Sequence, residues 1–267
     1  MHPALNIMIK AARRASQIIN RASLNVEHLQ ITAKQQHDFV TEVDRAAEGA
    51  IIEILREAYP DYGILAEESG HFAGDGGEYQ WIIDPLDGTT NFIHGFPQYA
   101  VSIALAHKGQ PVHGVVYDTL RNEMFTASKG GGAFLNERRI RVSKCLKLEH
   151  SLIGTGFPFK TLDHLDAYIA IFRELTGQTS GIRRPGAASL DLAYVACGRL
   201  DGFWEFGLCP WDMAAGCLLI LEAGGLVSDL AGGGKYMKHG NLIAGTPKVF
   251  AQLLHVIKKH AASTLSV

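Results

Sequence analysis

The stretch that decides the fold spans residues 81–92 and reads Trp81-Ile82-Ile83-Asp84-Pro85-Leu86-Asp87-Gly88-Thr89-Thr90-Asn91-Phe92. Its first three residues predict a buried strand, because a continuous apolar run that ends in a turn is typical of a strand covered on both faces. Pro85 cannot donate a hydrogen bond to a neighbouring strand and favours extended backbone at Asp84, so we expect the strand to end there. Asp84 and Asp87 then follow the apolar run, where acids are costly to bury unless they are paired or bind a cation.

The turn after this strand offers groups that bind phosphate. The sequence Asp87-Gly88-Thr89-Thr90 presents backbone N–H groups and two hydroxyls, a surface of the kind that holds an anion. Carboxylates are ligands that Mg²⁺ prefers, so a cation site beside an anion site indicates metal-assisted phosphate chemistry. The alternative is structural, because Asp-Pro and Asp-Gly are also ordinary turn dipeptides and acids often cap turns.

The length of the chain bears on its domain organisation. At 267 residues it suffices for one large domain or two joined halves. No linker, repeat or low-complexity stretch divides it. We therefore predict a single domain over residues 1–267 with an α+β fold, in which two packed halves of about 1–145 and 146–267 place helices against two sheets.

Composition argues against several classes of protein. A net charge of −2 supplies no basic field, so direct nucleic-acid binding is not expected. No apolar run approaches the ~20 residues of a membrane span, and basic residues interrupt any signal-peptide pattern near the N-terminus. The four cysteines show neither a Cys-x-x-Cys pair nor zinc-like spacing. We expect reduced thiols in a cytoplasmic protein without a membrane partner.

Hydrophobic periodicity predicts the order of helices and strands. Three strand-like runs at 100–106, 112–117 and 123–127 are separated by short turns and predict an antiparallel meander. Residues 24–37 are polar and mixed, and we expect them to be irregular. The expected helices cover 4–20, 42–59, 165–175, 187–197, 211–222 and 247–259, and the other expected strands cover 63–65, 152–155, 202–206, 226–228 and 242–244.

Further acids stand at the ends of predicted elements in the first half. Thr41 with Asp44 three residues later resembles a capping box, so Asp44 is either a helix cap or a site residue. Glu67 and Glu68 follow the short strand at 63–65 and repeat the pattern of an acid at a strand end. Adjacent acids are also typical of a solvated surface, and that alternative stays open for Glu67 and Glu68 on the local sequence.

Two acids in the second half of the chain also stand at the ends of predicted elements. Glu205 ends an apolar-aromatic strand, where an acid is costly unless a polar group approaches it. The alternative is that Glu205 pairs with a nearby arginine such as Arg199. Asp212 lies in the first turn of a predicted helix, where a negative charge suits the helix dipole.

The segment from Asp84 to Phe92 closely resembles a signature of the inositol monophosphatase family. Two further elements of that family are matched in order, and the resemblance runs from about Leu5 to about Val256. It implies a layered α-β-α-β-α fold with an antiparallel sheet and a second, mixed sheet. Residues 186–202 and 157–159 look most like the bacterial SuhB type within the family. The two further elements are Trp211-Asp212-Met213-Ala214-Ala215-Gly216, followed by Glu222-Ala223-Gly224-Gly225, and Glu67-Glu68-Ser69.

The resemblance implies a site for two to three Mg²⁺ ions. The first ion would be held by Glu67, Asp84 and the backbone carbonyl of Leu86. The second would be held by Asp84, Asp87 and Asp212, so that Asp84 bridges the two, and a weaker third ion would lie near Glu67. Clustered acids alone would repel a phosphate, and bound cations reverse that effect.

The resemblance also implies roles in catalysis and substrate binding. Gly88 and Thr89 match the phosphate-binding backbone and hydroxyl. Asp44 matches the acid that pairs with Thr89 to orient the attacking water. Glu205 and Ala188 match positions that meet the substrate's ring hydroxyls. One departure is Ala187, which stands where relatives often carry Thr or Ser. The full implied sets are Asp44, Thr89 and Glu67 for catalysis and Asp87, Gly88, Thr89, Ala188, Glu205 and Asp212 for substrate.

The function implied by the resemblance is Mg²⁺-dependent hydrolysis of inositol monophosphates by a lithium-sensitive, homodimeric phosphatase. Phosphate-monoester hydrolysis is among the slowest uncatalysed reactions, so the electrostatic contribution must be large. One alternative is another small phosphate, such as fructose 1,6-bisphosphate, a 3′-phosphoadenosine nucleotide or histidinol phosphate. A second alternative is a binding protein, because SuhB-type proteins are associated with RNA polymerase and ribosomal RNA transcription antitermination.

Overall fold

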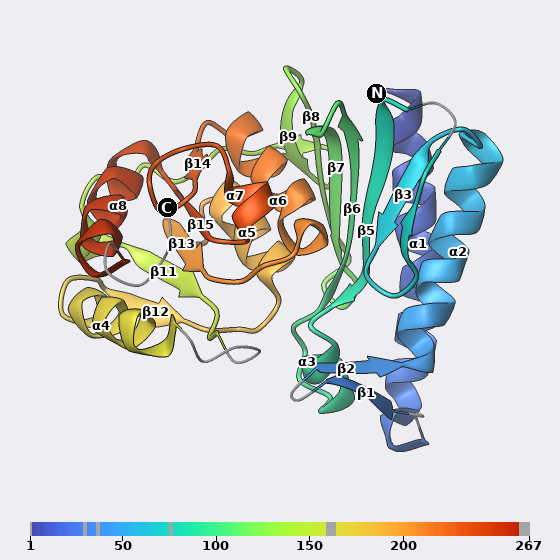
Figure 1. Ribbon diagram of the computed structural model, residues 1–267, viewed down its shortest axis with the longest axis horizontal. Helices are drawn as coiled ribbons and strands as arrows, with labels where there is room; N and C mark the ends of the chain where they lie inside the picture. The colour runs from blue at the N-terminus through green and yellow to red at the C-terminus, as the bar shows by residue number, and fades with distance from the viewer. Residues whose placement is uncertain (1, 29–30, 36–37, 75–76, 159–163, 262–267) are drawn as a thin grey trace.

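The computed structural model describes residues 2–28, 31–35, 38–74, 77–158 and 164–261. Helices and sheets alternate in five layers across the molecule, as Figure 1 shows. The layered α+β fold is therefore confirmed. Within the described ranges, no helix is both long and apolar enough to cross a membrane.

The first sheet has eight strands in the order β10-β9-β8-β7-β6-β5-β3-β4. The predicted meander forms its centre as β6, β7 and β8, which pair antiparallel with their neighbours. The sheet is antiparallel except where β3 runs parallel to β5. Its strands are β3 (Gly63–Ala66), β4 (Gly70–Phe72), β5 (Tyr79–Asp87), β6 (Ala100–His107), β7 (Gln110–Asp118), β8 (Glu123–Ser128), β9 (Gly132–Leu135) and β10 (Arg138–Arg139).

The second sheet has five strands in the order β12-β11-β13-β15-β14. It is mixed, because β11 runs parallel to both β12 and β13 while β15 runs antiparallel to β13 and β14. Its strands are β11 (Leu152–Thr155), β12 (Gly181–Arg183), β13 (Gly202–Glu205), β14 (Leu226–Ser228) and β15 (Leu242–Gly245).

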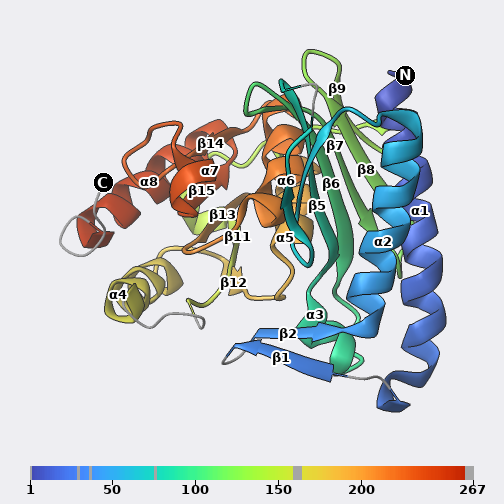
Figure 2. The same cartoon turned by 45° about the vertical axis from the view of Figure 1, so that its right-hand side comes forward.

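Helices cover both sheets and separate them (Figure 2). Two N-terminal helices pack on one face of the first sheet and form one core cluster with it. Two further helices lie between the sheets, in a second cluster that both sheets share. A third cluster lies between the second sheet and the outer helices. The outer helices lie on the far face of the second sheet. In the order of these layers the helices are α1 (Pro3–Ala22) and α2 (Glu42–Ala58), α5 (Ala188–Ala196) and α6 (Pro210–Glu222), and α4 (Leu165–Thr176) and α8 (Pro247–Ala261), with α3 (Thr89–Ile93) and α7 (Tyr236–His239) as short additions.

The prediction that the central strand ends at Asp84 is wrong, because β5 continues through Pro85 to Asp87. The register with β6 shifts between Asp84 and Asp87, so the strand carries a bulge at the proline. On its other side, β3 pairs with β5 no further than Ile83. The missing N–H of Pro85 therefore interrupts no ladder, and proline is tolerated in strands at such bulges and edges.

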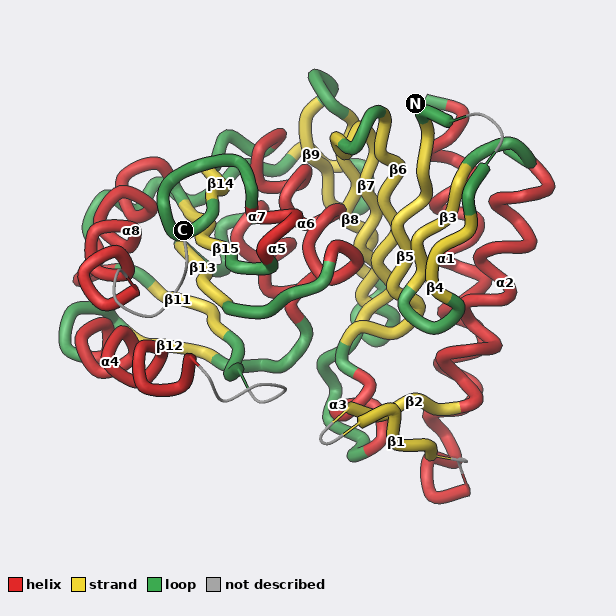
Figure 3. Tube along the Cα trace, viewed as in Figure 1, coloured by secondary structure: helices red, strands yellow, loops and turns green. Residues whose placement is uncertain are grey.

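The prediction that residues 24–37 are irregular is also wrong in part. Two short strands, β1 (Ile31–Gln35) and β2 (Asp38–Thr41), pair antiparallel and form a separate two-stranded sheet. Figure 3 shows this hairpin beside α3, next to the start of α2. The segment lacks a regular apolar alternation, so its sequence carries little of the signal by which strands are recognised.

Candidate metal centre

Three carboxylates that are far apart in the sequence meet between the first sheet and α6. Asp84, Asp87 and Asp212 each place an oxygen so that these atoms lie within 4.8 Å of one another. Asp84 and Asp87 come from the end of β5, and Asp212 comes from the first turn of α6. The side chain of Asp212 also accepts the backbone N–H of Cys209 at 2.6 Å, which fixes the start of that helix. The packing of α6 on the sheet therefore completes the acid cluster.

The bulge of β5 shapes the next part of the site. The backbone N–H of Leu86 donates to Asp84 Oδ1 at 3.0 Å, which holds this carboxylate in one orientation. The carbonyl of Leu86 accepts from the Thr89 hydroxyl at 3.1 Å. Gly88 has a φ of +95°, and a Cβ there would lie 2.8 Å from the carbonyl oxygen of Gln98. Only glycine fits this position of the turn.

Asp44 is both a helix cap and a site residue. Its Oδ2 accepts the backbone N–H of Thr41 at 2.8 Å and the Thr41 hydroxyl at 2.5 Å, which completes the predicted capping box of α2. Its Oδ1 accepts the Thr89 hydroxyl at 3.0 Å. The side chain of Asp44 is fully buried, so each of these bonds is shielded from water. The two roles of Asp44 left open by the sequence therefore coexist.

Asp87 has a partner that the sequence did not indicate. Its Oδ2 accepts the backbone N–H of Ser189 at 2.7 Å and the Ser189 hydroxyl at 2.5 Å. Ser189 follows Ala188 in the first turn of α5 and is fully buried. The structure thus brings the start of α5 against the end of β5. A serine in the first turn of a helix is too common to have pointed to this contact.

Glu67 lies beside the three acids, in the turn between β3 and β4. Its backbone N–H donates to the carbonyl of Ile83 at 3.1 Å, which places it next to Asp84. The carboxyl of Glu67 raises the pKa of Asp84, Asp87 and Asp44 through its negative charge. Glu67 is therefore part of the same electrostatic cluster and is not an isolated surface acid.

Glu205 stands at the end of β13, against the backbone of Gly156. A Cβ at Gly156 would lie 1.9 Å from Glu205 Oε1, so an added methyl group there would force this carboxylate to move. Arg199, the partner considered for Glu205, instead forms two hydrogen bonds of 2.5 Å with Glu123. Burial raises the pKa of Asp191 in α5, and the nearby charges of Glu205 and Asp87 raise it further.

Burial and mutual repulsion make the acids of this centre costly to ionise. The pKa of Asp84 lies well above its usual value, first because the group is desolvated and then because of Glu67, Asp87 and Asp212. Desolvation also raises the pKa of Asp87 to about 6, although the two hydrogen bonds from Ser189 act in the opposite direction. Buried acids of like charge become favourable when a cation neutralises them. The donor set, which is entirely oxygen, fits a hard divalent cation such as Mg²⁺.

The metal-free protein is expected to lose stability as the pH rises from about 4 to about 6. The pKa of Asp87 is about 6 in the folded state against an ordinary value of 3.8, so the unfolded chain releases this proton first. The unfolded state then binds fewer protons, and the free energy of unfolding falls until the folded group has also ionised. Thermal unfolding in EDTA between pH 4 and 8 measures this in the wild type and in Asp87→Asn, which lacks the titrating carboxyl. The melting temperature of the wild type minus that of Asp87→Asn should fall between pH 4 and 6. If it stayed constant or rose, the raised pKa of Asp87 would be contradicted.

The chain is similar to proteins of known family and structure. Residues 1–262 match the model of the inositol monophosphatase family. The chain is 55% identical to "Nus factor SuhB" of Pseudomonas aeruginosa over 99% of both chains. Among solved structures, it resembles the extragenic suppressor protein SuhB from Bartonella henselae, with a TM-score of 0.94, 45% identity and coverage of 97% and 99% of the two chains. It also resembles the inositol monophosphatase from Anabaena (Nostoc), with a TM-score of 0.85, 38% identity and coverage of 98% and 96%.

Proposed function

The chain belongs to the inositol monophosphatase family, and we propose that it hydrolyses inositol monophosphates to inositol and phosphate with two to three Mg²⁺ ions. The observation that carries this proposal is the meeting of Asp84, Asp87 and Asp212 within 4.8 Å. Such a cluster repels a phosphate by itself, but it binds one together with divalent cations. We further propose that the protein acts as a homodimer in the cytoplasm.

The residues present would hold the ions in two overlapping sets. Glu67, Asp84 and the carbonyl of Leu86 form one set, and Asp84, Asp87 and Asp212 form the other. When bound, the ions supply charge that neutralises the phosphate and lowers the pKa of a water molecule. The third, weaker ion is assigned to the neighbourhood of Glu67.

The chain's own groups orient the attacking water. The Thr89 hydroxyl has one proton and two acceptors within reach, Asp44 Oδ1 at 3.0 Å and the carbonyl of Leu86 at 3.1 Å. While it donates to Asp44, its oxygen lone pairs remain able to accept a hydrogen bond from water. The proton that the water releases can then pass to Thr89 Oγ1 while the Thr89 hydroxyl proton passes to Asp44, which thereby acts as the general base. The turn at Gly88 and Thr89 receives the phosphate, and Ala188 and Glu205 receive the substrate's hydroxyls.

A phosphate-release screen tests the reaction. We expect inositol monophosphate to be hydrolysed with Mg²⁺ and not after EDTA treatment, and we expect lithium to inhibit by competing for a loosely held metal position. Fructose 1,6-bisphosphate, a 3′-phosphoadenosine nucleotide and histidinol phosphate are the comparison substrates. If kcat/KM were higher for one of these than for inositol monophosphate, the protein would still be a metal-dependent phosphatase, but its substrate would be that compound. The absence of phosphate release from all of them would reject the activity.

Glu205→Gln is expected to lower selectivity among polyol phosphates more than it lowers hydrolysis itself. A carboxylate that bonds a substrate hydroxyl discriminates against analogues without that group, and its loss costs about 1–3 kcal/mol for that substrate. The measurement is kcat/KM for inositol monophosphate and for an aryl phosphate in both proteins. Gly156→Ala is a second variant, because the added methyl group would displace the Glu205 carboxylate without changing its charge. Equal losses on both substrates would leave Glu205 with a structural role.

A second function is proposed from the 55% identity to a protein named Nus factor SuhB. We propose that the chain also binds a transcription factor or RNA polymerase. The test is a pull-down of purified transcription components with the wild type and with Asp84→Asn. Retention by both proteins would show binding that does not need the metal centre, whereas retention by neither would reject this function and leave the phosphatase proposal intact.

A further inference from the structure

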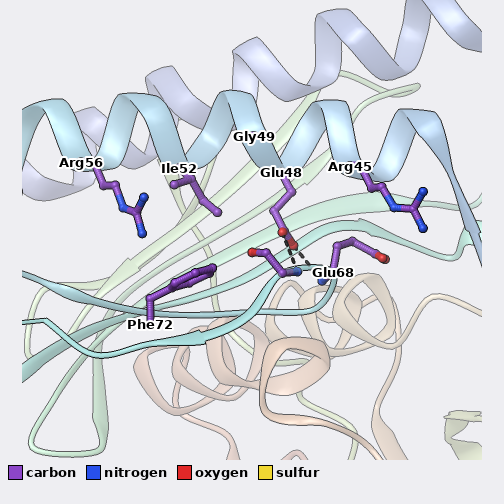
Figure 4. Close-up of a pocket in the computed structure, with 8 residues that line it drawn as sticks. Arg45, Glu48, Gly49, Ile52, Arg56, Glu68 and Phe72 are labelled. Carbon is purple, nitrogen blue, oxygen red and sulfur yellow. Dashed lines mark hydrogen bonds between the residues drawn. The ribbon is translucent and has the colours of Figure 1, made fainter.

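The turn that carries Glu67 is held from behind by a carboxylate on α2. Of the three backbone N–H groups in this turn, that of Glu67 donates to the carbonyl of Ile83 at 3.1 Å. The next two donate to Glu48, from Glu68 to Oε2 and from Ser69 to Oε1, each at 2.9 Å. Figure 4 shows the Glu48 side chain reaching from the helix to the turn. Every backbone donor of the turn therefore has an acceptor.

Glu48 is placed to act on the metal centre through this turn. It follows Asp44 by four residues on α2, so the two acids lie on one face of the helix at successive turns. Asp44 reaches Thr89, while Glu48 reaches the turn of Glu67. Glu48 is only 3% exposed, and a buried carboxylate that accepts two backbone N–H groups forms strong, well-directed bonds.

A pocket lies beside Glu48 and the turn of Glu67. On the outer side of the turn lies a pocket of about 320 Å³, lined by Arg45, Ile52 and Arg56 of α2 and by Phe72 of β4 (Figure 4). The Arg56 guanidinium stacks on the Phe72 ring at 5.2 Å, away from the turn itself. The two bonds to Glu48 tie the turn to α2 at the edge of this pocket.

We propose that Glu48 is a positioning residue that fixes the carboxylate of Glu67 for metal binding. This inference rests on the proposed function, because it assigns Glu67 to a metal. Side chains that orient a metal ligand from outside the coordination sphere typically change metal affinity by about 10–100-fold when they are mutated. Glu48 would exert this effect through the backbone of the turn and not through contact with the metal.

The test is Glu48→Gln, studied as the full chain after removal of bound metal. The amide keeps one acceptor oxygen and turns an NH₂ group toward the other N–H, so one of the two bonds is lost. We expect Mg²⁺ titration by calorimetry to show a Kd raised by about 10–100-fold for one class of site. We also expect amide hydrogen exchange, read by NMR without metal, to become faster at Glu68 and Ser69.

Glu222→Gln is the matched control. Glu222 ends α6, and its carboxylate accepts the backbone N–H groups of Gly130 and Gly132 at 2.7 Å each, in another hairpin turn. That turn carries no proposed metal ligand. We expect faster exchange at Gly130 and Gly132 and a Kd for Mg²⁺ within about twofold of the wild type.

The outcomes separate this proposal from the proposed function. Faster exchange at Glu68 and Ser69 with an unchanged Kd would overturn the positioning role and leave the metal centre in place. If the Kd for Mg²⁺ rose equally in Glu48→Gln and Glu222→Gln, the cause would be general destabilisation of the protein. That result would also overturn the positioning role of Glu48. A wild type that binds no Mg²⁺ would reject both the metal centre and the positioning role. If Glu48→Gln does not fold, Glu48→Asp retains the charge with a shorter reach, and wild-type affinity in that variant would overturn the proposal.

Discussion

Replacing Asp84 with asparagine is expected to lower kcat/KM by about 10³-fold or more while the protein stays folded. Asp84 is assigned to both metal sets, so the substitution removes the one charge that the two ions share. Electrostatic stabilisation by a metal contributes several kcal/mol to the transition state, and each 1.36 kcal/mol corresponds to a tenfold change in rate. The measurement is phosphate release at saturating Mg²⁺. Activity within tenfold of the wild type would contradict the two-metal assignment.

The same variant is expected to raise the stability of the metal-free protein. Asp84 is buried beside three other acids, and its raised pKa means that ionisation in the folded state is unfavourable. A neutral amide of nearly the same shape removes that repulsion. Thermal unfolding in EDTA at pH 8 measures the gain, and a lower melting temperature than the wild type would contradict it.

Asp118→Asn provides the control for a buried acid outside the centre. Asp118 is equally buried, but its Oδ2 accepts from Arg121 at 2.9 Å and its Oδ1 accepts from the backbone N–H groups of Leu120 and Arg121. Removing its charge breaks the ion pair with the partly exposed Arg121 and weakens the bonds from the two backbone N–H groups to a buried carboxylate, so it should destabilise the protein. We expect phosphate release to remain near the wild-type rate. Asp84→Asn should therefore raise stability and abolish most activity, whereas Asp118→Asn should lower stability and leave activity unchanged.

Thr89→Ala is expected to lower kcat by about 10²–10⁴-fold with little change in stability. The Thr89 hydroxyl links Asp44 to the position assigned to the attacking water, and general base catalysis of this kind contributes about that much. The side chain is only half-buried, so truncation opens no large cavity. Steady-state kinetics and thermal unfolding of the same preparation give the two quantities.

Thr41→Ala is the control for Thr89→Ala, because Asp44 accepts a hydrogen bond from the hydroxyl of Thr41 and from that of Thr89. Thr41 caps α2, and loss of a helix cap typically costs about 0.5–2 kcal/mol of stability. Its backbone N–H still donates to Asp44 at 2.8 Å in the variant, so the carboxylate should stay close to its place. We expect a lower melting temperature and less than a tenfold loss of kcat. If both variants lost kcat equally, the Thr89 hydroxyl would have no special catalytic role.

Local patterns predicted much of the fold correctly. The meander at 100–127 could be recognised because alternation and turn residues act over a few neighbours. The cap at Thr41 and Asp44 could be recognised because its two hydrogen bonds join residues three apart. The hairpin of β1 and β2 was missed because its polar and apolar residues are mixed without a regular period. The continuation of β5 through Pro85 was missed because it depends on where β3 ends.

The sequence by itself determined which groups are available: a strand that ends in two acids, a glycine turn with hydroxyls, a capped helix and an acid in the first turn of α6. Only the tertiary structure decided which of them meet. Asp212 reaches Asp84 because α6 packs between the two sheets, and Ser189 reaches Asp87 because α5 packs beside it. These contacts follow from burial of apolar faces, which is non-directional and leaves no local sequence pattern at the polar residues that it brings together.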